Sequence, residues 1–158
     1  MTEQTADLAV RNTITVEVSQ ARAFEVFTDG FATWWPKEHH IGANPPETVV
    51  VEGRPGGRCF ERAADGTECD WGRVKAYEPP GRLVIAWELD ADFEYDPASA
   101  TEVEVRFISE GPSTTRVELE HRGLEILGGR AEELRRSLGS PEGWPGILDR
   151  YAQVVGQG

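Results

Sequence analysis

The sequence predicts a single α+β domain in which a long C-terminal helix packs against an antiparallel sheet of about seven strands. The first observation is the alternation of apolar and polar residues with a period of two between residues 48 and 121, which is typical of strands with one buried face. The second is the spacing of turn signals such as Asp65-Gly66 and Pro79-Pro80-Gly81, which separate neighbouring strands. The third is a strongly apolar helical pattern at the end of the chain, which is the main candidate to cover the sheet.

Length and charge limit the functions open to the chain. Its 158 residues suit one domain over residues 1–158, with residues 1–8 expected to form a flexible tail. The 28 acidic residues outnumber the 16 basic ones and give a net charge of −12, which disfavours binding to nucleic acid or anionic membrane because phosphate would be repelled. No apolar run is long enough for a membrane span and the first residues lack a secretory signal, so we expect a cytoplasmic protein.

The N-terminal part of the chain predicts one strand followed by two short helices. Apolar residues occupy the even positions of residues 13–18, which indicates a strand. Ser19 is a suitable N-cap for a helix over residues 20–28. Residues 31–35 predict a second helix that stops at Pro36, and residues 37–47 predict a loop.

The middle of the chain predicts six consecutive strands. We expect them at residues 48–52, 58–62, 68–77, 82–89, 102–109 and 115–121. The acidic segment 90–100 contains a proline and predicts a loop. Outward positions on these strands carry glutamates such as Glu102, Glu104, Glu118 and Glu120, which we interpret as a solvated face of the sheet.

The C-terminal part predicts two helices. The first covers residues 130–138 with Gly139 as its C-cap. The second begins at residue 141 or 144 and ends at about residue 155, since Pro145 is tolerated only in a first turn. One stripe of this helix is apolar and is expected to face the sheet; it consists of Trp144, Leu148, Tyr151 and Val155.

Several short motifs, in order along nearly the whole chain, resemble one known family. They are Trp34-Trp35-Pro36, His40-Ile41-Gly42, Gly56-Gly57-Arg58, Trp71-Gly72-Arg73-Val74, the run from Glu78-Pro79-Pro80-Gly81-Arg82-Leu83 to Trp87, Leu119-Glu120-His121-Arg122-Gly123, and Gly143-Trp144. The pattern resembles the START/Bet v superfamily, also called SRPBCC, in the branch named for the activator of the heat-shock-protein ATPase. The resemblance implies the helix-grip fold and a cavity for apolar or amphipathic small molecules. Some members are cyclases or hydrolases, and the eukaryotic namesake binds a chaperone.

A curved sheet gripped by one helix leaves a space that large aromatic side chains tend to line, and the chain has five tryptophans. The residues that we expect around this cavity are Trp34, Trp35, His39, Phe60, Trp71, Trp87, Val105, Phe107, His121, Trp144, Leu148 and Tyr151. Of Trp34 and Trp35, we expect one to line the entrance and the other to pack, because one short helix cannot direct both inward. Trp87 is expected on the cavity side, whereas the face of Trp71 depends on strand register and stays open.

The sequence contains no recognisable catalytic set, and no catalytic residue, cofactor or metal is predicted. His121 ends an apolar inward row and is either a polar anchor or acid–base group in the cavity, or a structural histidine bonded at a strand end. If the protein were an enzyme, His121, Tyr151 and Glu61 would be the candidate groups. Adjacent His39 and His40 make a poor metal site, and Cys59 and Cys69 are expected to be small buried thiols without a disulfide or zinc.

Three functions therefore compete. The preferred one is a carrier or sensor of an apolar or aromatic small molecule in a cavity between the sheet and the C-terminal helix. The first alternative is a cyclase or hydrolase of polyketide-like compounds, which would act by shaping its substrate. The second alternative is a chaperone-associated interaction module. As partners we expect a small hydrophobic or aromatic ligand, no nucleic acid and no membrane, while a homodimer and a chaperone contact stay open.

Overall fold

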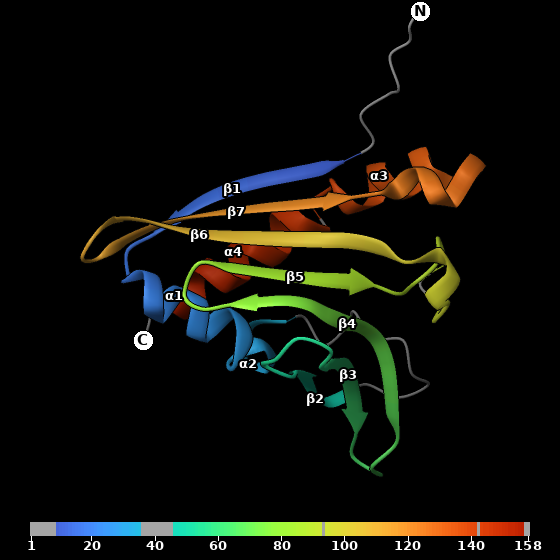
Figure 1. Ribbon diagram of the computed structural model, residues 1–158, viewed down its shortest axis with the longest axis horizontal. Coiled ribbons are helices and arrows are strands. Elements are labelled where there is room, and N and C mark those ends of the chain that lie inside the picture. The colour runs from blue at the N-terminus through green and yellow to red at the C-terminus, as the bar shows by residue number, and fades with distance from the viewer. Residues whose placement is uncertain (1–8, 36–45, 93, 142, 157–158) are drawn as a thin grey trace, which may run out of the picture.

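The computed structural model describes residues 9–35, 46–92, 94–141 and 143–156, and it has the predicted α+β architecture (Figure 1). A seven-stranded antiparallel sheet has the strand order β1-β7-β6-β5-β4-β3-β2. The strands are β1 Val10–Val16, β2 Pro46–Val51, β3 Arg58–Ala63, β4 Glu68–Glu78, β5 Arg82–Trp87, β6 Thr101–Gly111 and β7 Thr114–Arg122. Because β2 to β7 follow one another as a meander and β1 adds to β7, the sheet has β1 and β2 at its two edges.

The predicted helices are all present, with sharper bounds. The helices are α1 Gln20–Thr28, α2 Phe31–Trp34, α3 Ala131–Leu138 and α4 Trp144–Val155, with 3₁₀ turns η1 Pro97–Ser99 and η2 Leu124–Arg130. The Ser19 hydroxyl caps α1 by accepting from the Arg22 N–H at 3.2 Å. Gly139 ends α3, donating its N–H to the Arg135 carbonyl at 3.0 Å. Helix α4 begins at Trp144, which places Pro145 in the first turn.

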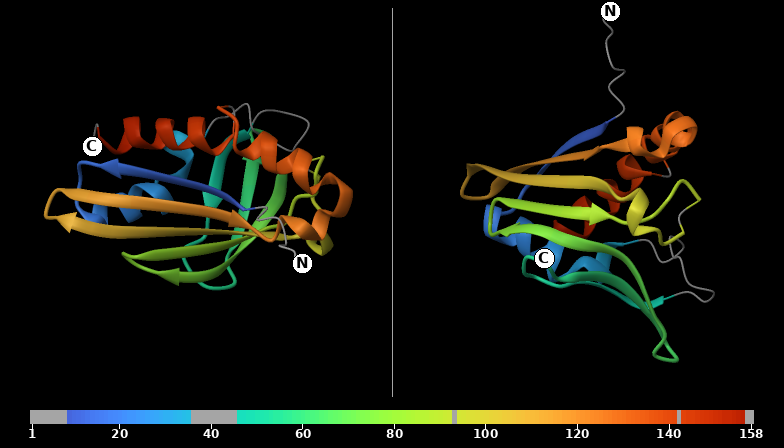
Figure 2. Two further views of the ribbon diagram at one scale, coloured as in Figure 1. Left: turned by 90° about the horizontal axis from the view of Figure 1, so that it is seen from above. Right: turned by 45° about the vertical axis from the view of Figure 1, so that its right-hand side comes forward.

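The curved sheet and helix α4 enclose one core (Figure 2). The predicted stripe of α4 is buried, as are the inward rows of the central strands. Helix α1 closes the same core at one end through Phe24 and Phe27, whose rings contact Phe107 edge-on at centroid distances of 5.2 and 5.5 Å. The Tyr151 hydroxyl donates to the Ala23 carbonyl at 2.7 Å and links α4 to α1. No helix within the described ranges is long and apolar enough to cross a membrane.

The outer face of the sheet carries the glutamates expected there, but one of them is not solvated. Glu104 is only 4% exposed, because the guanidinium groups of Arg82, Arg106 and Arg122 surround its carboxylate at 2.6 to 3.0 Å. Burial acts to raise the pKa of Glu104, but the hydrogen bonds from the three arginines outweigh it and hold the pKa at about 2. A buried, ionised carboxylate therefore joins strands β5, β6 and β7.

Phe60 also belongs to this outer face, so its prediction as a cavity residue is wrong. The guanidinium carbons of Arg58 and Arg62 lie 4.1 and 5.3 Å from the Phe60 ring centroid. These three residues alternate along β3 and share one side of the strand. The two arginine side chains cover the ring, which is why Phe60 is buried without joining the core.

Candidate functional site

The candidate site is a group of apolar side chains between the inner face of the sheet, α2 and the start of α4, which we call the aromatic cluster. It is formed by Phe27, Phe31, Trp35, Trp71, Ile85, Trp87, Val103 and Trp144. The space left between these side chains has a volume of about 10 Å³, which is at most enough to hold one water molecule. The spacious cavity expected from the sequence is therefore not open in this structure, and a ligand would have to displace a side chain.

A β-bulge turns Trp71 toward the cluster. Between β3 and β4, Cys59 pairs with Gly72 and the next residue, Phe60, pairs with Asp70. Trp71 of β4 is therefore the extra, unpaired residue of the bulge. Gly72 pairs with Trp87 on the other side. As a result the Trp71 and Trp87 rings meet, with centroids 5.6 Å apart.

Gly72 has no room for a side chain. A Cβ there would lie 2.6 Å from the Ala86 carbonyl oxygen, 3.2 Å from Cγ2 of Ile85 and 3.5 Å from Cβ of Cys59. The glycine thus lets β4 lie close to β5 at the point where the bulge redirects Trp71.

Trp35 lies in the middle of the cluster. Its ring stacks on Phe31 at a centroid distance of 5.0 Å and is nearly parallel to Trp71 at 6.1 Å. The Trp144 and Trp87 rings lie 6.1 and 6.5 Å from it.

The expectation that one short helix cannot direct both Trp34 and Trp35 inward is wrong, since both are buried. Helix α2 ends at Trp34, and Trp35 has an extended backbone with ψ of 127°, so the two side chains leave the chain in different directions. Trp34 packs on Phe27 and Tyr151 and donates its indole N–H to the Val26 carbonyl at 2.9 Å. Trp34 is thus a core residue, and Trp35 lines the cluster.

The cluster is bounded at one side by a buried polar group made of His121, Thr101 and Trp144. The indole N–H of Trp144 donates to Nδ1 of His121 at 3.0 Å. Nδ1 is therefore the unprotonated nitrogen, and Nε2 carries the proton and donates it to the Thr101 hydroxyl oxygen at 2.7 Å. Burial lowers the pKa of His121 to about 3, which keeps the ring neutral. Both nitrogens of His121 are thus engaged inside the protein, and the ring orients Trp144.

The other two candidates for catalysis do not join His121 in the cluster. Tyr151 uses its hydroxyl to bond the Ala23 carbonyl, and burial raises the pKa of Tyr151. Glu61 is buried on β3, and neither Glu61 nor Tyr151 lines the cluster. In the described ranges no three His, Cys, Asp or Glu side chains form a metal-binding group. Cys59 and Cys69 are free thiols, and Cys69 is only half-buried rather than buried as expected.

The structure brings four of the predicted cavity residues together in the wall of the cluster, namely Trp35, Trp71, Trp87 and Trp144. Apart from Phe60 on the outer face, the remaining predicted residues that are buried lie inside the protein but outside this wall: Trp34, Val105, Phe107, His121, Leu148 and Tyr151. His39 lies outside the described residues. Phe27, Phe31, Ile85 and Val103 also line the cluster but were not predicted as cavity residues. Phe27 and Phe31 are four residues apart, a spacing that could have indicated neighbouring rings at the end of α1.

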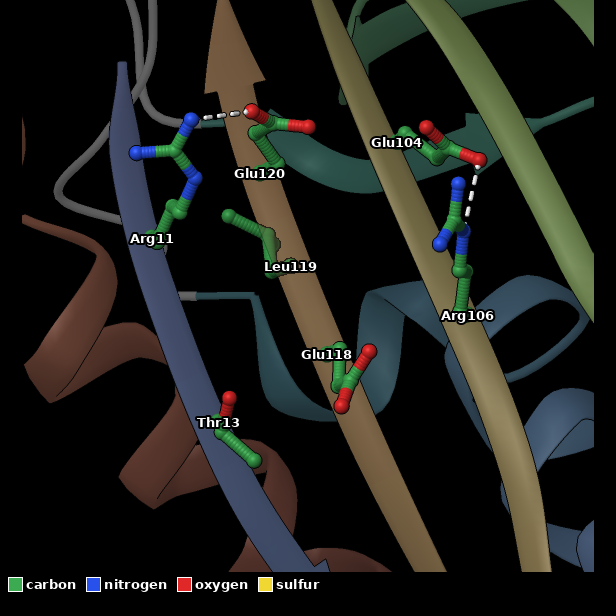
Figure 3. Close-up of a pocket in the computed structure, with 7 residues that line it drawn as sticks. All are labelled: Arg11, Thr13, Glu104, Arg106, Glu118, Leu119 and Glu120. Atoms are coloured by element: carbon green, nitrogen blue, oxygen red, sulfur yellow. Dashed lines mark hydrogen bonds and ion pairs between the residues drawn. The ribbon is translucent and has the colours of Figure 1, made fainter. Parts of the chain in front are cut away.

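A larger hollow of about 310 Å³ lies on the outer face of the sheet (Figure 3). It is lined by Arg11, Thr13, Glu104, Arg106, Glu118, Leu119 and Glu120. Arg11 bonds Glu120 at 2.9 Å and Arg106 bonds Glu104 at 3.0 Å, as the dashed lines in Figure 3 show. Because these charges already pair with one another, the first across β1 and β7 and the second within β6, the hollow offers a ligand few free charges.

Comparison with known proteins identifies the family. The family described as "Activator of Hsp90 ATPase homolog 1-like protein" matches residues 17–156. The chain belongs to this family. The AHSA1-like match covers α1 through α4, and thus every residue of the aromatic cluster. A comparison with curated protein sequences finds no match.

Solved structures agree with the AHSA1-like assignment. The anthrahydroquino-γ-pyrone synthase Txn09, in complex with SUM, is 37% identical, with a TM-score of 0.65 over 92% of this chain and 96% of its own. The self-sacrificing resistance protein CalC from Micromonospora echinospora is 30% identical, with a TM-score of 0.70 over 96% of each chain. An HSP90 activator from Plasmodium falciparum is 19% identical, with a TM-score of 0.50 over 72% of this chain and 71% of its own, and shares the fold alone.

Proposed function

We propose that the protein binds a planar aromatic small molecule in the aromatic cluster. The observation that carries this proposal is the convergence of four indole and two phenyl rings on one place between the sheet and α4. Such walls bind flat aromatic molecules through stacking and edge contacts with little loss of side-chain entropy. The 37% identity with a synthase of an anthrahydroquino-γ-pyrone supports a polycyclic aromatic ligand.

Trp35 is the side chain that we expect the ligand to displace. Its ring occupies the central position, between Phe31 and Trp71. The other three indoles of the wall are anchored on strands β4 and β5 or on helix α4, whereas Trp35 follows the last residue of the short helix α2. A flat ligand in its place would meet the same ring neighbours that Trp35 meets now.

Titration with 9-fluorenone, a neutral planar tricyclic ketone, tests this proposal. We expect wild-type protein to bind fluorenone saturably, and Trp35→Ala to bind it more tightly because no indole has to leave. Tyr95→Ala is the matched control, since Tyr95 is an aromatic residue outside the cluster and 45% exposed, and its affinity should equal that of the wild type. Calorimetry measures the affinities. The absence of saturable binding to both wild type and Trp35→Ala would refute the function, and equal affinity of these two would refute the displacement of Trp35.

Cyclisation of a polyketide-like substrate is the second candidate, because the 37% identical structure is that of a synthase. The aromatic cluster could favour one folded conformer of such a substrate by shape. Against this, His121 and Tyr151 use their polar atoms inside the protein. Incubation of the purified protein with a polyketide-type polyphenol, followed by mass spectrometry, distinguishes the two: unchanged, bound compound supports a binder, and a cyclised product supports an enzyme.

A chaperone contact has less support in the described part of the chain. The large apolar side chains exposed there are Tyr95 and Ile126, which do not make an extended patch. The ligand-binding proposal is therefore favoured over an interaction module.

A further inference from the structure

The indole N–H of Trp87 is a buried hydrogen-bond donor with no acceptor among the described residues. Trp87 is only 5% exposed, so water at the surface does not serve it. Leaving a buried donor unpaired costs about 1–3 kcal/mol, and buried indole N–H groups normally have partners. Trp34 and Trp144 follow this rule, since their N–H groups donate to the Val26 carbonyl and to His121.

The aromatic rings that contact Trp87 have no acceptor to offer it. Trp71, Trp144 and His121 lie at centroid distances of 5.6, 5.7 and 5.2 Å from it. Both nitrogens of His121 are already bonded, to Thr101 and Trp144. Trp87 itself is held in the sheet between Gly72 of β4 and Thr101 of β6, so its side chain starts from a fixed backbone.

We propose that Trp87 donates its indole N–H to the ligand, and that the ligand is therefore a planar aromatic molecule with an uncharged oxygen acceptor at its edge, such as an aryl ketone, a quinone or a pyrone. This inference rests on the proposed function. Trp87 is part of the wall of the aromatic cluster, where the other lining side chains are apolar or aromatic. The acceptor is uncharged because no cationic side chain lines the cluster and an anion buried there would lose its hydration without compensation.

A cycle of two ligands and two proteins tests the assignment. 9-Fluorenone and fluorene have the same tricyclic frame and differ by the carbonyl oxygen. We expect the ratio of fluorenone to fluorene affinity to be about tenfold higher for wild-type protein than for Trp87→Phe. In wild-type protein the ketone exchanges its hydrogen bond to water for one from the Trp87 indole, whereas in Trp87→Phe it loses that bond on binding. Trp71→Phe makes the same reduction in ring size in the facing wall, and should keep the wild-type ratio.

The indole N–H signal gives a second, direct readout. In a ¹H–¹⁵N spectrum the Trp87 resonance is assigned by its loss in Trp87→Phe, or by elimination through Phe variants of the other four tryptophans if Trp87→Phe does not fold. We expect fluorenone to move this resonance downfield and fluorene not to do so.

The outcomes separate the two proposals. Two results would overturn the role of Trp87 and leave the proposed function standing, provided that fluorenone binds saturably. One is an equal affinity ratio in wild type and Trp87→Phe, and the other is the absence of a downfield movement of the Trp87 resonance. A ratio that falls equally in Trp71→Phe also overturns the assignment to Trp87. If neither compound binds, both proposals fall.

Discussion

Replacing Gly72 by alanine should destabilise the protein and disturb the aromatic cluster. The added Cβ would lie 2.6 Å from the Ala86 carbonyl oxygen, which belongs to the backbone of the neighbouring strand β5 and cannot rotate away. Strands β4 and β5 must therefore separate locally, and the Cγ2 of Ile85 at 3.2 Å must move as well. Insertion of one methyl group into a packed interior typically costs about 1–3 kcal/mol, so we expect a loss of this size in the free energy of unfolding.

Thermal and urea denaturation measure the loss. For a domain of this length each kcal/mol lowers Tm by about 2–4 °C, which predicts a decrease of roughly 2–12 °C. Gly129→Ala is the matched control, because a Cβ at Gly129 would meet no atom within 4 Å, and it should unfold like the wild type. The near-ultraviolet circular dichroism of Gly72→Ala should also change, since the bulge that directs Trp71 adjoins Gly72. Equal stability of the two variants would refute the close approach of β4 and β5.

Two further predictions concern buried ionisable groups. The pKa of His121 is about 3 in the folded protein against 6.5 for a free side chain, so the unfolded chain takes up a proton first and stability falls as the pH drops from 6.5 toward 3. Wild type should lose up to about 1.4 kcal/mol per pH unit in this window relative to His121→Gln, measured by urea unfolding between pH 7 and 5, and parallel curves would contradict the buried neutral ring. Glu104 has a pKa of about 2 against 4.5, so its contribution is present above pH 4.5 and is lost as the pH falls toward 2. Glu104→Gln should reduce stability at pH 7 by about 1–3 kcal/mol, whereas Glu118→Gln, whose side chain is 38% exposed, should change it by less than about 0.5 kcal/mol; equal effects would contradict the special burial of Glu104.

The order of the elements could be predicted from the sequence because the physical signals are local. Period-two alternation, the caps at Ser19 and Gly139 and the apolar stripe of α4 each depend on a few neighbouring residues. The face of Trp71 could not be predicted, because the β-bulge opposite Cys59 shifts the register and leaves no clear sign in the sequence. The closure of the cluster depends on how side chains from six elements pack together, which no local pattern encodes.

Phe60 and Trp35 show two different kinds of error. For Phe60 the signal was present: Arg58 and Arg62 alternate with it on one face of β3, and two guanidinium groups would not enter an apolar core. For Trp35 the sequence contained no such signal. The direction of its side chain depends on α2 ending at Trp34, one residue before the predicted end of the helix.

The spacing of the tryptophans has an optical consequence. Each of the five indoles has another within 5.6 to 6.5 Å between ring centroids, so excitation energy absorbed by one can migrate to the others before emission. The intrinsic fluorescence of the protein is then a property of the whole group. A single quenching molecule bound beside Trp87 would quench the fluorescence of all five tryptophans together. The unlabelled protein is therefore a sensitive reporter of any molecule that enters the cluster.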